Sequence, residues 1–128
     1  MSAQFRTPIK IARGLGSARS GAHHFMVQRI TAVALIALGL WIVWIALEAL
    51  HMDYASARAL IAKPWNAVLM IAFLIASFWH AQLGLQVIIE DYMHAKGLEL
   101  AAQIAVKFAC FLGAAASVLA VIRIALGS

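Results

Sequence analysis

The chain has 128 residues, of which 65% are hydrophobic and only 12% are charged. Ordinary soluble domains are roughly 45–50% apolar and about 25% charged, so this composition excludes a soluble domain and indicates a small membrane protein. The formal net charge is +5, and a single cysteine, Cys110, excludes an intrachain disulfide and a cysteine-rich metal site.

The first predicted element is a basic segment over residues 1–29. It contains no acidic residue and five basic ones: Arg6, Lys10, Arg13, Arg19 and Arg29. Because the segment directly precedes an apolar run, a place beside a membrane is favoured over nucleic-acid binding, and positive charge is kept on the cytoplasmic side. It lacks the short apolar core of a cleaved signal peptide. We therefore expect a retained cytoplasmic N-terminus.

The rest of the chain, residues 30–128, is predicted to be an all-α transmembrane domain. A spanning helix needs about 20 apolar residues, and three runs meet this requirement. They cover about 30–50, 65–89 and 104–126, with connections expected over 48–64 and 90–103. Pro64 favours a helix start at Trp65. With the basic segment inside, the 48–64 connection lies outside and the 90–103 connection inside.

Small residues recur every four positions through the third run. They are Ala101, Ala105, Ala109, Gly113 and Ser117. Small side chains on one stripe allow close helix contact in lipid. Three helices make a thin bundle, so the stripe favours packing against neighbouring helices and a partner subunit.

His80 is the main candidate for chemistry. It lies nine residues before the end of the second run, about 14 Å from that boundary at 1.5 Å per residue. Ionisable groups at this depth are costly and indicate function. His80 either hydrogen-bonds a neighbouring helix or binds haem iron, and Gly84, one turn on, leaves room for a flat cofactor. As no second histidine lies at this depth, a second axial histidine would come from another chain.

Polar groups at both ends of the runs are further candidates. Asp91 and Tyr92 close the second run on the inner side; Tyr92 is either an interfacial anchor or a hydrogen-bond donor to a quinone carbonyl. Arg29, at the start of the first run, is either a topology signal or the partner of an anionic group such as a haem propionate. The same two interpretations apply to His23 and His24.

These stretches together resemble the small hydrophobic membrane anchor of succinate dehydrogenase, respiratory complex II, its cytochrome b-type D subunit. The most specific match is His80-x-x-x-Gly84 continued to Asp91-Tyr92. The second is the glycine-rich stretch 14–21 followed by His23-His24-Phe25 and Gln28-Arg29-Ile-Thr-Ala32. The three-span layout and length fit as well, so the resemblance covers most of the chain.

The resemblance implies a role in succinate:ubiquinone oxidoreduction. A flavoprotein subunit would oxidise succinate, and an iron–sulfur subunit would carry electrons to a ubiquinone pocket shared with two membrane chains in the bacterial inner membrane. This chain would be one of the two. It would contribute His80 as an axial ligand of haem b, Gly84 beside the haem, Arg29 and His23 near the propionates, and Tyr92 with Asp91 at the quinone.

Three other functions are alternatives to a succinate dehydrogenase anchor. A fumarate reductase anchor would run the reverse reaction. A proton-coupled transporter would need a membrane-buried carboxylate, and no Asp or Glu lies in the middle of a run. A structural anchor without cofactor would leave His80 and the Asp91-Tyr92 pair unexplained.

Overall fold

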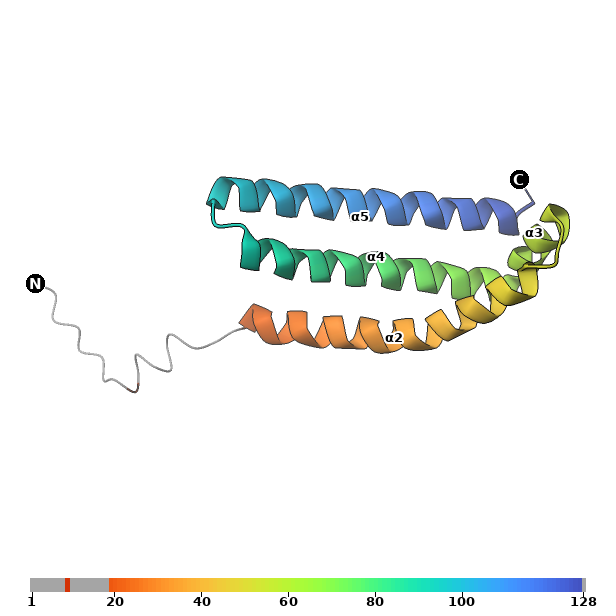
Figure 1. Ribbon diagram of the computed structural model, residues 1–128, viewed down its shortest axis with the longest axis horizontal. Helices are drawn as coiled ribbons and strands as arrows, with labels where there is room; N and C mark the ends of the chain where they lie inside the picture. The colour runs from red at the N-terminus through yellow and green to blue at the C-terminus, as the bar shows by residue number, and fades with distance from the viewer. Residues whose placement is uncertain (1–8, 10–18, 128) are drawn as a thin grey trace, which may run out of the picture.

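The computed structural model describes residue 9 and residues 19–127, and the ordered elements in this part are helices (Figure 1). In chain order they are α2 (Arg19–Ala49), α3 (Tyr54–Ala62), α4 (Pro64–Tyr92) and α5 (Lys96–Ala125). The all-α prediction is confirmed. Most of the basic segment 1–29 lies outside the described residues, and the cytoplasmic placement of the N-terminus stays a prediction.

Three of the helices are long and apolar enough to cross a membrane: 29 residues of α2 from Gly21, the 29 residues of α4 and the 30 of α5. At 1.5 Å per residue each is about 43–45 Å long, more than the roughly 30 Å of hydrocarbon in a bilayer. The helix ends therefore reach into the interface. This explains why the helices run past the predicted apolar runs.

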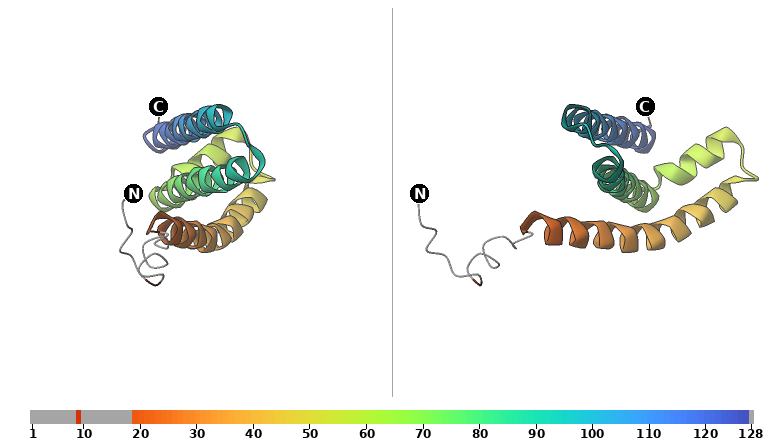
Figure 2. Two further views of the ribbon diagram at one scale, coloured as in Figure 1. Left: turned by 90° about the vertical axis from the view of Figure 1, so that its left-hand side faces the viewer. Right: turned by 60° about the vertical axis from the view of Figure 1, so that its left-hand side comes forward.

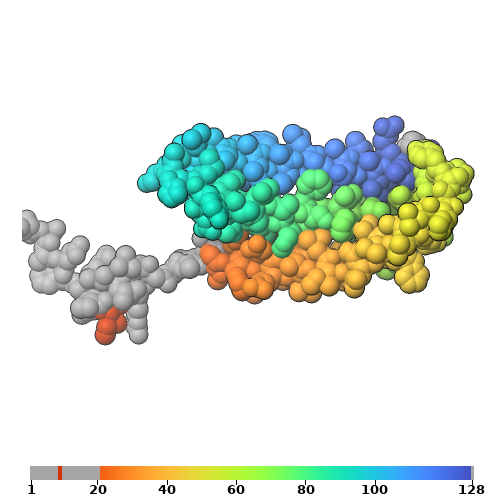
Figure 3. All heavy atoms as spheres, in the orientation of Figure 1, coloured from red at the N-terminus to blue at the C-terminus, as the bar shows by residue number. Residues whose placement is uncertain are grey.

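The long helices lie side by side with α4 in the middle (Figures 1 and 3). Helix α4 contacts both α2 and α5, whereas α2 and α5 do not contact each other in the described chain. Helix α2 curves away from α4 towards its C-terminal end, and α3 leads back from there to the start of α4 (Figure 2). The start of α2 and the α4–α5 connection therefore share one end of the bundle.

The predicted helix start near Pro64 is confirmed within one residue. Pro64 is the first residue of α4, where its missing N–H costs no hydrogen bond. Lys63 before it has ψ 130, the extended backbone that a following proline imposes. The chain thus turns from α3 into α4 through a single non-helical residue.

The first connection, expected over 48–64, contains α3. Asp53 caps this helix, because its Oδ1 accepts a hydrogen bond of 3.1 Å from the Ser56 N–H. The hydrogen bonds from Ser56 lower the pKa of Asp53 from its ordinary value. The signal was present in the sequence, since an Asp cap precedes an alanine-rich stretch with high helix propensity.

The second connection, expected over 90–103, is only three residues long. Helix α4 continues to Tyr92, and α5 already begins at Lys96. Beside this link Glu90 Oε1 accepts hydrogen bonds from Gln86 Nε2 at 2.8 Å and from Gln103 Nε2 at 3.4 Å. Polar residues therefore extend both helices beyond the apolar runs and join them side by side.

The small-residue stripe of the third run is only partly a packing face within this chain. A Cβ on Gly113 would lie 2.6 Å from Cε1 of Phe78, so the α5 backbone and the Phe78 ring meet closely there. Ala101, Ala105 and Ala109 are exposed. The stripe thus packs against α4 at Gly113 and leaves its first half open.

Gly113 supplies a test of this packing. Gly113→Val should destabilise the protein by about 1–3 kcal/mol, the usual cost of overpacking, because the new side chain displaces the Phe78 ring. Thermal unfolding in detergent measures the change. Gly97→Ala is the matched control, as a Cβ there meets nothing within 4 Å. Phe78→Leu should partly restore stability to Gly113→Val; equal stability of Gly113→Val and wild type would contradict the close contact.

Candidate functional site

His80 lies near the middle of α4. Residue 78 is the midpoint of Pro64–Tyr92, so His80 is two residues past it and about 18 Å of helix from Tyr92. Its ring is partly buried, and Nδ1 lies 3.0 Å from Oγ1 of Thr31 on α2. Thr31 is three residues from residue 34, the midpoint of α2. The two helices are therefore joined by a hydrogen bond near the middle of each.

The other ring nitrogen of His80 has no hydrogen-bond partner among the described residues. One turn further along α4, a Cβ built on Gly84 would meet nothing within 4 Å. An unengaged imidazole nitrogen next to a bare stretch of helix suits a flat, metal-containing cofactor such as haem. The described residues contain no group of three or more potential metal ligands, so a metal here would need ligands from outside the chain.

Asp91 and Tyr92 form the last turn of α4, and both are exposed. Asp91 is eleven residues from His80, only about 20° away around the helix, whereas Tyr92 is about 120° away. The Tyr92 side chain is 78% exposed and is available to a molecule outside this chain. The two residues therefore share one boundary position but face different sides.

His23 lies in the second turn of α2, Arg29 lies two residues before Thr31, and both are exposed. The Arg29 guanidinium lies over the Phe25 ring, 5.0 Å from its centroid, a cation–π arrangement. Arg29 is two residues from Thr31 and so about 200° away around α2. The structure thus does not bring Arg29 or His23 into contact with His80, and any shared ligand would have to reach around the helix.

Thr31 was not predicted as a site residue, and His24 shared the two open interpretations of His23. Thr31 contacts His80, 49 positions away, for which no local sequence signal exists. His24 has a buried Nε2 without a hydrogen-bond partner in the described part of the chain. Residues 24 and 31 are seven apart and therefore share a face of α2.

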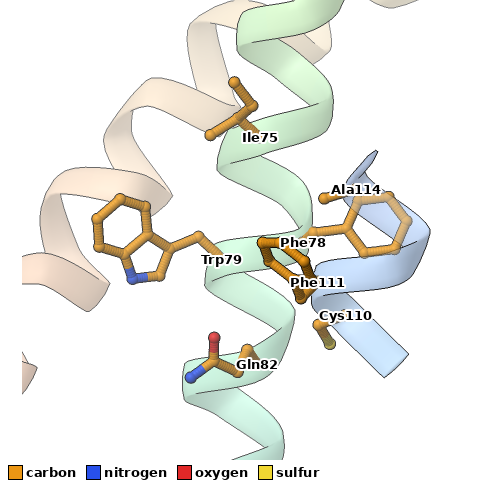
Figure 4. A pocket seen from close by; sticks show the side chains of 7 residues that line it. All are labelled: Ile75, Phe78, Trp79, Gln82, Cys110, Phe111 and Ala114. Atoms are coloured by element: carbon orange, nitrogen blue, oxygen red, sulfur yellow. The ribbon is translucent and has the colours of Figure 1, made fainter. Parts of the chain in front are cut away.

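A separate small pocket of about 180 Å³ lies between α4 and α5 (Figure 4). Its lining is Ile75, Phe78, Trp79, Gln82, Cys110, Phe111 and Ala114. Ligand pockets usually measure about 300–1,000 Å³ and combine apolar walls with several polar groups. This one is smaller, and Gln82 is its one amide, so it is a surface hollow between packed helices.

Comparison with known families decides the class of the protein. The model of the succinate dehydrogenase/fumarate reductase transmembrane subunits matches residues 3–119. The chain belongs to this family. The resemblance drawn from His80, Gly84 and the Asp91-Tyr92 pair is thereby confirmed at the level of the family, while the roles of these residues stay predictions.

Three bacterial relatives illustrate the similarity, each a succinate dehydrogenase hydrophobic membrane anchor subunit. The one from Rickettsia bellii is 37% identical over 75 residues, 59% of this chain and 60% of the relative. Those from Rickettsia conorii and Paracoccus denitrificans are 32% and 31% identical over 72 residues, 56% of this chain and 57% and 56% of theirs. The matches thus span less than two thirds of the relatives. No solved structure shows significant similarity.

Proposed function

We propose that the chain is the membrane anchor of a bacterial succinate:ubiquinone oxidoreductase. The observation that carries the proposal is His80, an imidazole at mid-membrane depth with Nδ1 engaged by Thr31 and the other nitrogen unengaged. Family membership gives the class of complex, and the relatives named above are anchors of succinate dehydrogenase. This favours succinate oxidation over fumarate reduction.

In this proposal His80 is an axial ligand of haem b. A bound haem b would supply a one-electron redox centre within the membrane. His80 would provide one nitrogen to the haem iron, Gly84 would leave the adjacent helix surface clear, and a second membrane subunit would provide the other protein ligand. Arg29 and His23, both exposed in the first half of α2, would pair with the propionates. Arginine suits this role because its fork binds carboxylates with two hydrogen bonds.

Tyr92 is proposed to donate a hydrogen bond to a ubiquinone carbonyl at the cytoplasmic boundary. Reduction places negative charge on the quinone oxygens, so a fixed phenol donor stabilises the charge where it develops. Asp91 lies next to it and would tune the site. Both side chains are exposed, which fits a pocket completed by partner subunits.

The surface of α2 supports such partners. Apolar side chains on it are more than 60% exposed at a helical spacing: Ile30, Val33, Ile36, Leu40 and Trp44. A stripe of this kind must meet lipid or another membrane chain. We assign it to the second membrane subunit and lipid of the bacterial inner membrane, with an iron–sulfur and a flavoprotein subunit bound on the cytoplasmic side.

The haem assignment is tested by His80→Ala in the purified complex. Loss of the axial nitrogen should abolish or alter the low-spin b-type optical spectrum, while succinate oxidation with a soluble dye persists because flavin lies in another subunit. His51→Ala, an exposed histidine at the other end of the bundle, is the control. An unchanged spectrum in His80→Ala would show that a different residue binds the haem iron, whereas absence of a b-type signal from the wild-type complex would favour a cofactor-free anchor.

The role of Arg29 is tested by comparing Arg29→Leu with Arg29→Lys. Leucine removes the charge and should weaken haem retention, measured as haem per flavin, and shift the haem potential. Lysine keeps the charge and loses only the fork, so its effect should be smaller. If both complexes retain wild-type haem content and potential, Arg29 serves only as a topology signal.

The role of Tyr92 is tested by Tyr92→Phe, which removes only the hydroxyl. Loss of one hydrogen bond worth about 1.4 kcal/mol should lower succinate:quinone reductase activity about tenfold, with haem content and succinate:dye activity near normal. Tyr54→Phe, a tyrosine 81% exposed at the opposite end, is the matched control. Full quinone reductase activity in an assembled Tyr92→Phe complex would return Tyr92 to an interfacial anchor.

A further inference from the structure

The hydroxyl of Thr31 has three polar atoms within hydrogen-bond distance. The carbonyl oxygens of Val27 and Gln28, in the preceding turn of α2, lie 2.9 and 3.0 Å from Oγ1. Nδ1 of His80 lies 3.0 Å from the same oxygen, across the helix interface. A hydroxyl has one proton to donate and two lone pairs to accept with, so the three contacts restrict one another.

The carbonyl oxygens can only accept, and this decides the direction of the bond to His80. If Thr31 donated its proton to Nδ1, the two carbonyl oxygens would lie about 3 Å from Oγ1 with no proton between them and that oxygen. If the proton points to the backbone, a lone pair of Oγ1 is free to accept from Nδ1–H. All three contacts are then compatible. The network thus assigns the Nδ1–H tautomer to His80.

The tautomer has a direct chemical consequence. A neutral imidazole carries one N–H and one lone pair, so an Nδ1–H ring presents its lone pair at Nε2. No described residue donates to Nε2. Metal-binding histidines usually donate their other N–H to an oxygen acceptor, which fixes the tautomer and the ring orientation and makes the ligand more basic. The Thr31 hydroxyl stands where such an acceptor is needed.

We propose that Thr31 is the positioning residue of His80, holding the ring as the Nδ1–H tautomer with Nε2 directed at haem iron. The proposal rests on the assignment of His80 as the haem ligand and adds a residue on a different helix. At this depth little water competes for Nδ1, so the bond is stronger than it would be at the surface. Its back-bonded position on α2 keeps the Thr31 oxygen in a fixed direction.

Two measurable effects follow. Donation from Nδ1–H increases electron density at Nε2, which favours the oxidised iron and lowers the midpoint potential of a haem bound there. The same bond fixes the plane of the imidazole, to which the low-spin ferric EPR spectrum responds. Loss of the acceptor should therefore raise the midpoint potential and change the EPR g values. It should also speed haem release about tenfold, the lower end of the effect usually seen when a hydrogen-bond partner of a metal ligand is removed.

The test compares Thr31→Val with Thr31→Ser in the complete detergent-solubilised complex. Valine keeps the shape and removes the hydroxyl, so all three effects should appear. Serine keeps the hydroxyl and should return the potential, the EPR spectrum and the rate of haem transfer to apomyoglobin to near wild-type values. Ser77→Ala removes a hydroxyl one turn before His80 on α4 and should leave all three unchanged, because no hydrogen bond joins Ser77 to His80.

The outcomes separate this inference from the haem assignment. If Thr31→Val has the wild-type potential, EPR spectrum and rate of haem release, the proposed role of Thr31 is overturned. The haem assignment still stands in that case if His80→Ala loses the haem spectrum. Equal shifts in Thr31→Val and Thr31→Ser would also overturn it, because the methyl group and not the hydroxyl would then matter. A normal low-spin spectrum in His80→Ala would overturn both.

If the Thr31→Val complex does not assemble, Thr31→Cys tests the same role of Thr31. Thr31→Cys has a side chain of similar size whose sulfur is a weak acceptor. It should shift the potential in the same direction as Thr31→Val and by a smaller amount. A potential equal to that of the wild type in an assembled Thr31→Cys complex would count against the proposal.

Discussion

The hydrogen bond between Thr31 and His80 is the constraint on which the rest of the site depends. In hydrocarbon a polar side chain needs a partner within the protein, so this contact fixes both the rotation of α2 and its register along α4. Once these are set, Nε2 of His80 is the nitrogen left for a ligand, and Gly84 lies on the same side of α4. The contact thus links helix packing to the geometry of a cofactor site.

Helix α4 is held differently on its two sides. Towards α2 it uses a polar contact at mid-depth, and towards α5 it uses the close approach of Phe78 to Gly113. Glu90 adds a hydrogen bond from Gln103 of α5 near the α4–α5 connection. Because α2 and α5 do not meet in the described chain, the three helices form an open row and enclose little core. Such a row reaches a closed structure only with further helices or lipid around it.

The sequence predicted what depends on composition and local chemistry. The three long apolar helices, the start of α4 near Pro64 and the mid-membrane position of His80 all follow from hydropathy and proline geometry. It did not predict α3, because this nine-residue helix is too short to form a spanning apolar run and Asp53 is its one capping signal. It did not predict the short link after Tyr92, because polar residues continue both helices into the interface. The pairing of Thr31 with His80 depends on the rotation of two helices, which no local pattern encodes.

The continuity of α4 gives the site its fixed dimensions. His80 and Tyr92 belong to one unbroken helix, so their separation of about 18 Å is set by helix rise and not by the conformation of a loop. The angular offset of about 120° likewise follows from twelve residues of helix. A cofactor held by His80 and a quinone held by Tyr92 would therefore occupy different sides of α4 at different depths. Partner chains would have to approach both sides, and the open row of helices leaves both accessible.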